Sequence, residues 1–284
     1  MTLLSSAAGG VLKPEQIGPL VVQPLTEQSV AMQVSTVIAT DSPEFRFPRV
    51  TSTPTGGWFG EAEEIDLSDP GIDEKICTPK AFKSLTKISN ELVNDSSPKA
   101  ADLVGQLMAA DIARAVDARY FGGTLAKAPD GLASLAGAQL VDAGTAWDSL
   151  DPFADAIAKA TDVGATITAW CASSATVNTL MKLKQFSGDT DSLVPLLGSD
   201  PNMPTRKQVL GIPLYGLPAG VIDDTVIWAI CREKAFVVLR NDVSLAVDQS
   251  AYFSSDSVGV RSVIRLDFAW PHEQAVIQLS ISGS

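Results

Sequence analysis

The stretch SPKAADLVGQLMAADIARAVDARYFGGTLAKAPDGL, residues 97–132, reads as one long helix with both ends marked. Ser97 is a preferred N-cap residue, and Pro98 suits the first helical position. Gly122 and Gly123 are permissive residues at the other end. Between these ends stand strong helix formers, with few β-branched residues and no proline. At 1.5 Å per residue the helix would be roughly 35 Å long, so we expect other elements to pack along it.

Apolar residues form two adjacent stripes along this predicted helix. One stripe holds Leu103, Leu107 and Ala110, and the other holds Val104, Met108, Ile112, Ala115 and Val116. Leu107 and Met108 lie mid-helix, and we expect both to be buried against a sheet that contains the alternating segment 258–270. The change Leu107→Asp is therefore expected to cost several kcal/mol, because it would bury an unpaired charge.

The composition restricts the classes of function. Lys plus Arg is 21 and Asp plus Glu is 33, which gives a formal net charge of −12 over 284 residues. This charge opposes broad contact with nucleic acid phosphates. Cys77, Cys171 and Cys231 are far apart and form no CxxC pair, so we expect reduced thiols rather than a zinc site or disulfides. The N-terminus does not resemble a signal peptide, and no apolar window reaches the length of a membrane span.

Two segments lack a core of their own. Residues 1–33 are interrupted by glycine and proline too often for a long helix, so they should form an extended arm. Residues 44–50 and 75–88 are predicted strands, and the acid-rich segment 51–74 between them should form the tip of a projecting hairpin. We predict that other subunits cover the apolar side chains of the arm and hairpin. The predicted inter-subunit contact residues are Ile17, Val21, Val22, Trp58, Phe59 and Glu61.

The acidic residues of the hairpin suggest one further contact. The run from Glu61 to Glu74 is expected to meet basic residues of a neighbouring subunit rather than to bind cations. The candidate partners are Arg46, Arg49, Lys80, Lys83 and Arg206.

The second half of the chain alternates helices and strands. Residues 151–160 and 173–184 are predicted helices, the second capped by Ser173 or Ser174. The predicted strands are 165–170, 209–215, 226–230, 235–239, 258–270 and 275–279. This order predicts a helix-flanked sheet and places the chain in the α+β class.

Several motifs occur in the order found in HK97-fold bacteriophage major capsid proteins. The segment KISNELVNDS at 87–96 resembles the family's lead into its spine helix. The segments AADIARAVD at 109–117, YFG at 120–122 and PDGL at 129–132 resemble the spine helix and its exit. The segment GGWFGE at 56–61 resembles part of the family's E-loop hairpin. The resemblance covers nearly the whole chain.

This resemblance implies an HK97-like capsid fold with a defined division of the chain. The implied parts are an N-terminal arm (1–33), the E-loop hairpin and its P-domain base (34–89), the P-domain spine helix (90–135), an A-domain with a helix-flanked sheet (136–257), and P-domain return strands with the C-terminus (258–284). Many family members begin with a scaffolding segment that a protease removes. Met1 favours a separate scaffolding protein here.

The resemblance also implies a function. It indicates the structural major capsid protein of a tailed double-stranded DNA bacteriophage, which self-assembles into pentamers, hexamers and an icosahedral shell. Its main partner would be itself, with a scaffolding protein, a portal and a decoration protein as further partners. The shell would enclose DNA without sequence-specific binding and without a membrane, and it would be assembled in the host cytoplasm and found in the virion. The alternative is an encapsulin-type bacterial nanocompartment shell.

Few residues suggest chemistry. Ser84 and Lys87 fit the S-x-x-K signature of acyl enzymes, which needs the serine at a helix start, and no SDN or KTG triplet accompanies them. His272 is the single histidine, and no G-x-S-x-G occurs. We therefore expect no enzyme activity, catalytic site, cofactor or metal site, and an acyl hydrolase built on Ser84 remains the alternative from another class.

Overall fold

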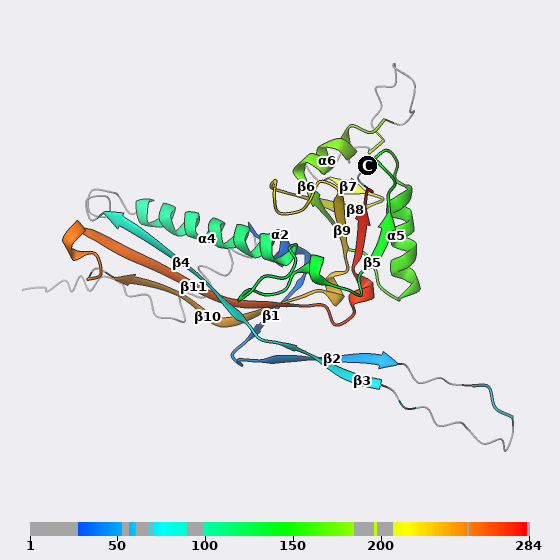
Figure 1. The fold of residues 1–284 in the computed structure, drawn as a ribbon, viewed down its shortest axis with the longest axis horizontal. Helices are drawn as coiled ribbons and strands as arrows, with labels where there is room; N and C mark the ends of the chain where they lie inside the picture. Colours follow the sequence, from blue (N-terminus) through cyan, green and yellow to red (C-terminus); the bar gives the residue numbers. More distant parts are fainter. Residues whose placement is uncertain are drawn as a thin grey trace, which may run out of the picture.

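The computed structural model describes residues 28–52, 57–60, 69, 71–89, 99–184, 196–197, 207–248 and 250–282. These residues form two sheets, a long helix that lies along one of them, and a hairpin that projects from the opposite side of that sheet (Figure 1). The predicted α+β class is confirmed.

The long helix and the alternating strand pack together as predicted. Helix α4 (Lys99–Tyr120) runs along a four-stranded sheet of order β1-β10-β11-β4 (Figure 1). The strands are β1 (Thr36–Thr40), β10 (Phe236–Asp248), β11 (Ser257–Ala269) and β4 (Lys80–Ser89). β11 is antiparallel to both of its neighbours, while β1 pairs in parallel with the first part of β10.

A six-stranded sheet lies at the C-terminal end of α4 (Figure 1). Its order is β5 (Gln139–Asp142), β12 (Ile277–Ser280), β9 (Val226–Ile230), β6 (Ala169–Ser173), β8 (Ile212–Leu217) and β7 (Gln208–Val209). Helices α5 (Asp151–Asp162) and α6 (Ser174–Met181) flank it. Ser173 is the N-cap of α6, because its side chain accepts a hydrogen bond from the backbone N–H of Thr176.

Short elements join these layers. α2 (Val30–Val34) precedes β1, and single 3-10 turns occur at η1 (Leu132–Ser134), η2 (Arg232–Lys234), η3 (Phe253–Ser255) and η4 (Glu273–Ala275). The hairpin consists of β2 (Phe45–Ser52) and β3 (Gly71–Cys77). The predicted strand 75–88 is in fact two strands, β3 and β4, because the chain breaks at Thr78 and Pro79. Proline has no N–H for a strand ladder.

One core joins the two sheets. It contains side chains from α2, from the C-terminal half of α4, from β11 and from one face of the six-stranded sheet. A second core lies on the other face of that sheet, under α5 and α6, where the rings of Phe153 and Trp170 lie 4.9 Å apart. A small third cluster lies at the base of the hairpin.

The strand pairings bear on the division of the chain into parts. β10 falls within 136–257, yet it pairs in the four-stranded sheet, and β12 falls within 258–284, yet it pairs in the six-stranded sheet. The division stays a proposal, and these pairings favour grouping β10 with the spine helix and β12 with the six-stranded sheet.

Candidate assembly interfaces

In the part of α4 whose side chains the structure describes, Met108, Ile112 and Val116 of one stripe are buried, whereas Leu107 and Ala110 of the other are exposed. Met108 is 7% exposed and was correctly predicted as buried, but Leu107 is 62% exposed, so the prediction for Leu107 is wrong. Successive helical residues are about 100° apart, and a sheet covers a limited arc of the helix. The predicted destabilisation by Leu107→Asp assumed that Leu107 is buried, so that prediction no longer holds. An exposed leucine on a central helix is instead a candidate contact with another molecule.

The exit of α4 is closely packed. The ring of Tyr120 lies 5.0, 5.1 and 5.3 Å from those of Phe121, Phe268 and Trp270, measured between centroids. Gly131 then passes directly over the helix end. A Cβ at Gly131 would lie 2.2 Å from the carbonyl oxygen of Arg119 and 2.3 Å from that of Gly122. The PDGL motif therefore contains a glycine because the backbone comes too close for any side chain.

The outer face of the hairpin carries an exposed apolar pair beyond the Arg46–Glu74 ion pair. Phe45 and Phe47 on its inner face pack with Phe236, with the rings of Phe47 and Phe236 4.9 Å apart. Val50 and Ile72 are cross-strand partners on the other face, and they are 61% and 70% exposed. Exposed apolar side chains paired on a projecting element are typical of a contact surface.

The predicted inter-subunit contact residues are only partly described. Trp58 is fully exposed, and Phe59 is partly buried. Ile17, Val21, Val22 and Glu61 lie outside the described residues. The contact of all six with other subunits stays a prediction.

The four-stranded sheet carries a basic face opposite α4. Phe82 and Ile264 are cross-strand partners that pack in the core with α4, so the alternate residues of β4 and β11 point to the other side. The basic face consists of Lys83, Lys87, Arg240, Arg261 and Arg265. Arg240 and Arg265 are directly opposite each other, while Lys83, Lys87 and Arg261 are exposed. Lys87 also lies 5.3 Å from the ring centre of Tyr252. Asp248, paired with Gly259, lies on the same side.

The basic residues that the sequence suggested as partners of the acidic hairpin do not all lie on the basic face. Lys83 lies on the basic face, but Lys80 donates a 2.7 Å hydrogen bond to the carbonyl of Ala128. Arg46 pairs with Glu74 of its own hairpin at 3.0 Å. Arg206 lies outside the described residues. Arg261 and Arg265 were missed, although their spacing of four within an alternating strand predicts that they share a face.

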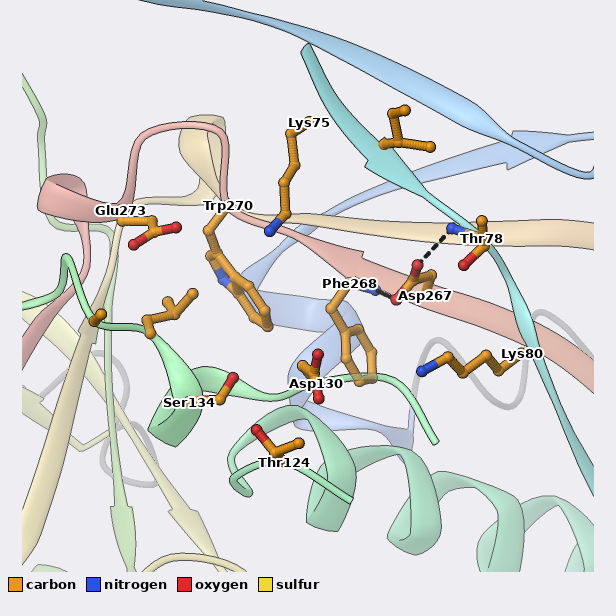
Figure 2. Close-up of a pocket in the computed structure, with 13 residues that line it drawn as sticks. Lys75, Thr78, Lys80, Thr124, Asp130, Ser134, Asp267, Phe268, Trp270 and Glu273 are labelled. Carbon is orange, nitrogen blue, oxygen red and sulfur yellow. Dashed lines mark hydrogen bonds between the residues drawn. The ribbon is translucent and has the colours of Figure 1, made fainter. Parts of the chain in front are cut away.

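A cleft of about 370 Å³ lies at the root of the hairpin. Figure 2 shows Asp267 beside Thr78 and Phe268, whose backbone N–H groups donate to its carboxylate over 2.7 and 2.8 Å. Burial raises the pKa of Asp267, despite these hydrogen bonds and the nearby Lys80. Asp267 thus holds the break between β3 and β4 in place. Lys75, Asp130, Trp270 and Glu273 also line the cleft (Figure 2).

The described residues give little support for catalysis. Ser84 lies within a strand opposite Ser262, so the helix start required by S-x-x-K is absent there, and Lys87 points to the opposite face of the same strand. His272 lies partly buried, with Nε2 3.4 Å from the carbonyl oxygen of Val163. In the described part of the chain, no three His, Cys, Asp or Glu side chains are grouped so that they could hold a metal.

All three cysteines lie in the interior of the subunit. Cys77, Cys171 and Cys231 are buried and free. Burial raises the pKa of Cys77 to about 12 and that of Cys171 well above its ordinary value. Among the helices that the structure describes, none has the length and apolar character needed to cross a membrane.

Comparison with known proteins places the chain in a family. The profile of the Phage capsid family matches residues 9–281. The structure is similar to that of Microbacterium phage Oxtober96, with a TM-score of 0.72 and 17% identity over 90% of this chain and 91% of that one. The capsid of an empty GTA particle has a TM-score of 0.71 and 17% identity, over 100% and 95% of the two chains. For Mycobacterium phage Bobi the TM-score is 0.71 and the identity is 14%, over 90% and 91%. No curated relative matches the chain significantly. The chain therefore belongs to the phage capsid family, has the HK97 fold of phage capsid proteins, and is a major capsid protein.

Proposed function

We propose that this chain works without catalysis, through contacts between copies that close pentamers and hexamers into an icosahedral shell around double-stranded DNA. The exposed outer face of the hairpin carries this proposal, because an isolated subunit leaves Val50, Ile72 and Trp58 open to water. The comparison particle computed with C5 symmetry supports rings of five. Scaffolding, portal and decoration proteins remain proposed further partners.

Charge supports a specific pairing between neighbours. The basic face concentrates five cations in a chain whose formal net charge is −12. The hairpin segment 61–74 holds seven acidic residues, Glu61, Glu63, Glu64, Asp66, Asp69, Asp73 and Glu74. We propose that the acidic hairpin of one copy lies on the basic face of the next. Two different surfaces that meet head-to-tail generate a ring when the rotation closes.

The enclosed DNA is held by confinement in this proposal, not by affinity for the wall. An acidic subunit should bind duplex DNA negligibly at physiological salt, which fluorescence anisotropy would measure. Binding below about 1 µM with a steep salt dependence would contradict this part of the proposal.

Electron microscopy of the purified protein tests the main proposal. Closed icosahedral shells are the expected result, whereas a monomer at all concentrations would contradict it. The contents of the native particle distinguish a phage capsid from a nanocompartment shell. Enclosed DNA would support the capsid, and an enclosed enzyme would support the nanocompartment.

Charge reversal tests the pairing. Lys87→Glu with Arg261→Glu should abolish shell formation at low salt, while the free energy of unfolding should change by less than about 0.5 kcal/mol because both residues are exposed. Adding Glu63→Lys and Glu64→Lys to the same chain should restore shells, and these two changes alone provide the matched control. If the reversed basic face still assembles normally, this pairing is wrong.

A further inference from the structure

Asp117 is a carboxylate buried inside the subunit without a cation. It lies on α4 and is 6% exposed. Among the described residues, the ion pairs within 4.0 Å involve Arg46 with Glu44 and Glu74, and none includes Asp117. A buried charge without a cation is costly unless hydrogen bonds satisfy it. The donors that satisfy Asp117 therefore indicate what this residue does.

All of these donors come from the start of α2. Oδ1 accepts hydrogen bonds from the hydroxyl of Ser29 at 2.7 Å and from the backbone N–H of Ala31 at 2.9 Å. Oδ2 accepts one from the backbone N–H of Val30 at 3.2 Å. Ser29 is itself fully buried and is the N-cap of α2. One carboxylate on α4 thus satisfies the N-terminal donors that a helix leaves unpaired.

A second contact holds the other end of α2. The hydroxyls of Ser35 and Tyr120 are 2.6 Å apart, and both residues are buried. Asp117 and Tyr120 are three residues apart, so they lie on the same side of α4. α2 has only five residues, too few to be stable alone. Its position therefore depends on α4.

We propose that Asp117 is the positioning residue for the N-terminal arm: it fixes where, and in which direction, residues 1–27 leave the subunit, and hence which neighbouring copy they reach. Asp117 acts through Ser29 and α2 without touching the neighbour. This inference rests on the proposed function, since the arm's target is another copy of the chain. Without the anchor, the start of α2 frays and the arm leaves in varying directions.

Hydrogen exchange on the unassembled subunit tests the anchor directly. Asp117→Asn replaces one acceptor oxygen with an N–H₂ group, which only donates, so at least one of the three donors must lose its acceptor. The amides of residues 30–34 should then exchange at least tenfold faster, while those of β6 and β9 keep their rates. Asp111→Asn, an exposed change on the same helix, is the matched control and should alter these rates less than twofold. Unchanged protection at residues 30–34 in Asp117→Asn would overturn the inference.

A milder variant covers the case in which Asp117→Asn does not fold. Ser29→Ala removes one of the three donors and leaves both backbone donors in place. It should speed exchange at residues 30–34 by a smaller factor, and no change there would again overturn the inference.

Assembly provides the second readout. If the wild type forms shells, Asp117→Asn should give at least tenfold fewer closed particles or particles of irregular size, whereas Asp111→Asn assembles normally. Normal shells with the arm in the same place in Asp117→Asn would overturn the positioning role. If the wild type forms no shells, the proposed function fails, and hydrogen exchange alone decides whether Asp117 anchors α2.

Discussion

The C-terminal end and the middle of α4 are built very differently. At the C-terminal end, Tyr120 packs among the aromatic rings of Phe268 and Trp270, and the core continues into the six-stranded sheet. In the middle, Met108 is buried outside that continuous core, and the sheet beneath presents small polar residues such as Ser84 and Ser262. Ser262 Oγ is buried without a hydrogen-bond partner among the described residues.

The two parts of α4 therefore have different roles. Close packing and hydrogen bonding at the C-terminal end fix the two sheets relative to each other. The middle of the helix carries the exposed Leu107, and the distal part of the sheet carries the exposed Lys87 and Arg261. We infer that the C-terminal end determines the fold, while the exposed side of the middle of α4 gains further contacts in the shell.

Removing the aromatic centre should have the largest effect. Tyr120→Ala deletes a fully buried ring and leaves Ser35 without its hydroxyl partner. The expected loss is about 3–5 kcal/mol in the free energy of unfolding of the unassembled subunit, measured by urea denaturation.

Leu107→Ala on the same helix is the control for this change and should cost less than about 0.5 kcal/mol. If the two substitutions cost similar amounts, the C-terminal end and the middle of α4 do not differ as described.

The next effect should come from the backbone contact at the helix exit. Gly131→Ala places a methyl group within 2.8 Å of three carbonyl oxygens, those of Arg119, Tyr120 and Gly122. Because backbone atoms cannot move aside cheaply, the expected cost is about 1–3 kcal/mol, seen as a lower melting temperature. Gly123→Ala is the matched control, since a Cβ there meets nothing within 4 Å. Equal melting temperatures for the two variants would contradict the close approach at Gly131.

The position of the spine helix could be predicted from the sequence, because helix formers and the glycines after Phe121 are local signals. The predicted N-cap Ser97 and Pro98 lie outside the described residues, and the close backbone contact at Gly131 appears only in the structure. The choice between the stripes of Leu107 and Met108 could not be predicted either. Both stripes are apolar, and only the tertiary structure determines which one meets the sheet.

The candidate interfaces were predictable to a smaller extent. The acidic residues of the hairpin form a continuous run in the sequence, whereas the basic face is assembled from β10 and β11 together with β4, which is far from them in sequence. Asp117 belongs to a motif that resembles the family's spine helix, but its partners Ser29 and Ala31 are more than 80 residues away. No local pattern indicates a contact of that length.

A smaller effect should appear in the pH dependence of stability. Burial raises the pKa of Asp117 above its ordinary value of 3.8, so the folded chain binds this proton more tightly than the unfolded chain does. The contribution of Asp117 to the free energy of unfolding should therefore increase as pH falls from neutral through the folded-state pKa towards 3.8. Asp117→Asn lacks this contribution, so the wild type should gain stability relative to the variant on acidification.

Comparing the wild type with Asp117→Asn removes the contributions of the other titrating groups, because both proteins contain them. Asp223 and Asp248 are exposed, and hydrogen bonds from Thr225 and Ser250 lower their pKa values, so they contribute with the opposite sign in both proteins. Urea denaturation from about pH 7 to about pH 4 measures the difference. A wild type that loses stability relative to Asp117→Asn over this range would show that the pKa of Asp117 is not raised.

The smallest effect on folding should follow from charging the exposed stripe of α4. Leu107→Asp should change the free energy of unfolding of the unassembled subunit by less than about 0.5 kcal/mol, because its side chain is already largely in water. Met108→Asp, one position along, should cost several kcal/mol, because it buries an unpaired carboxylate. If Leu107 instead contacts another subunit, Leu107→Asp should reduce shell formation while leaving the subunit's urea midpoint unchanged. A loss of more than about 1 kcal/mol in the subunit would show that Leu107 is covered within its own chain, and the middle of α4 would then belong with its C-terminal end.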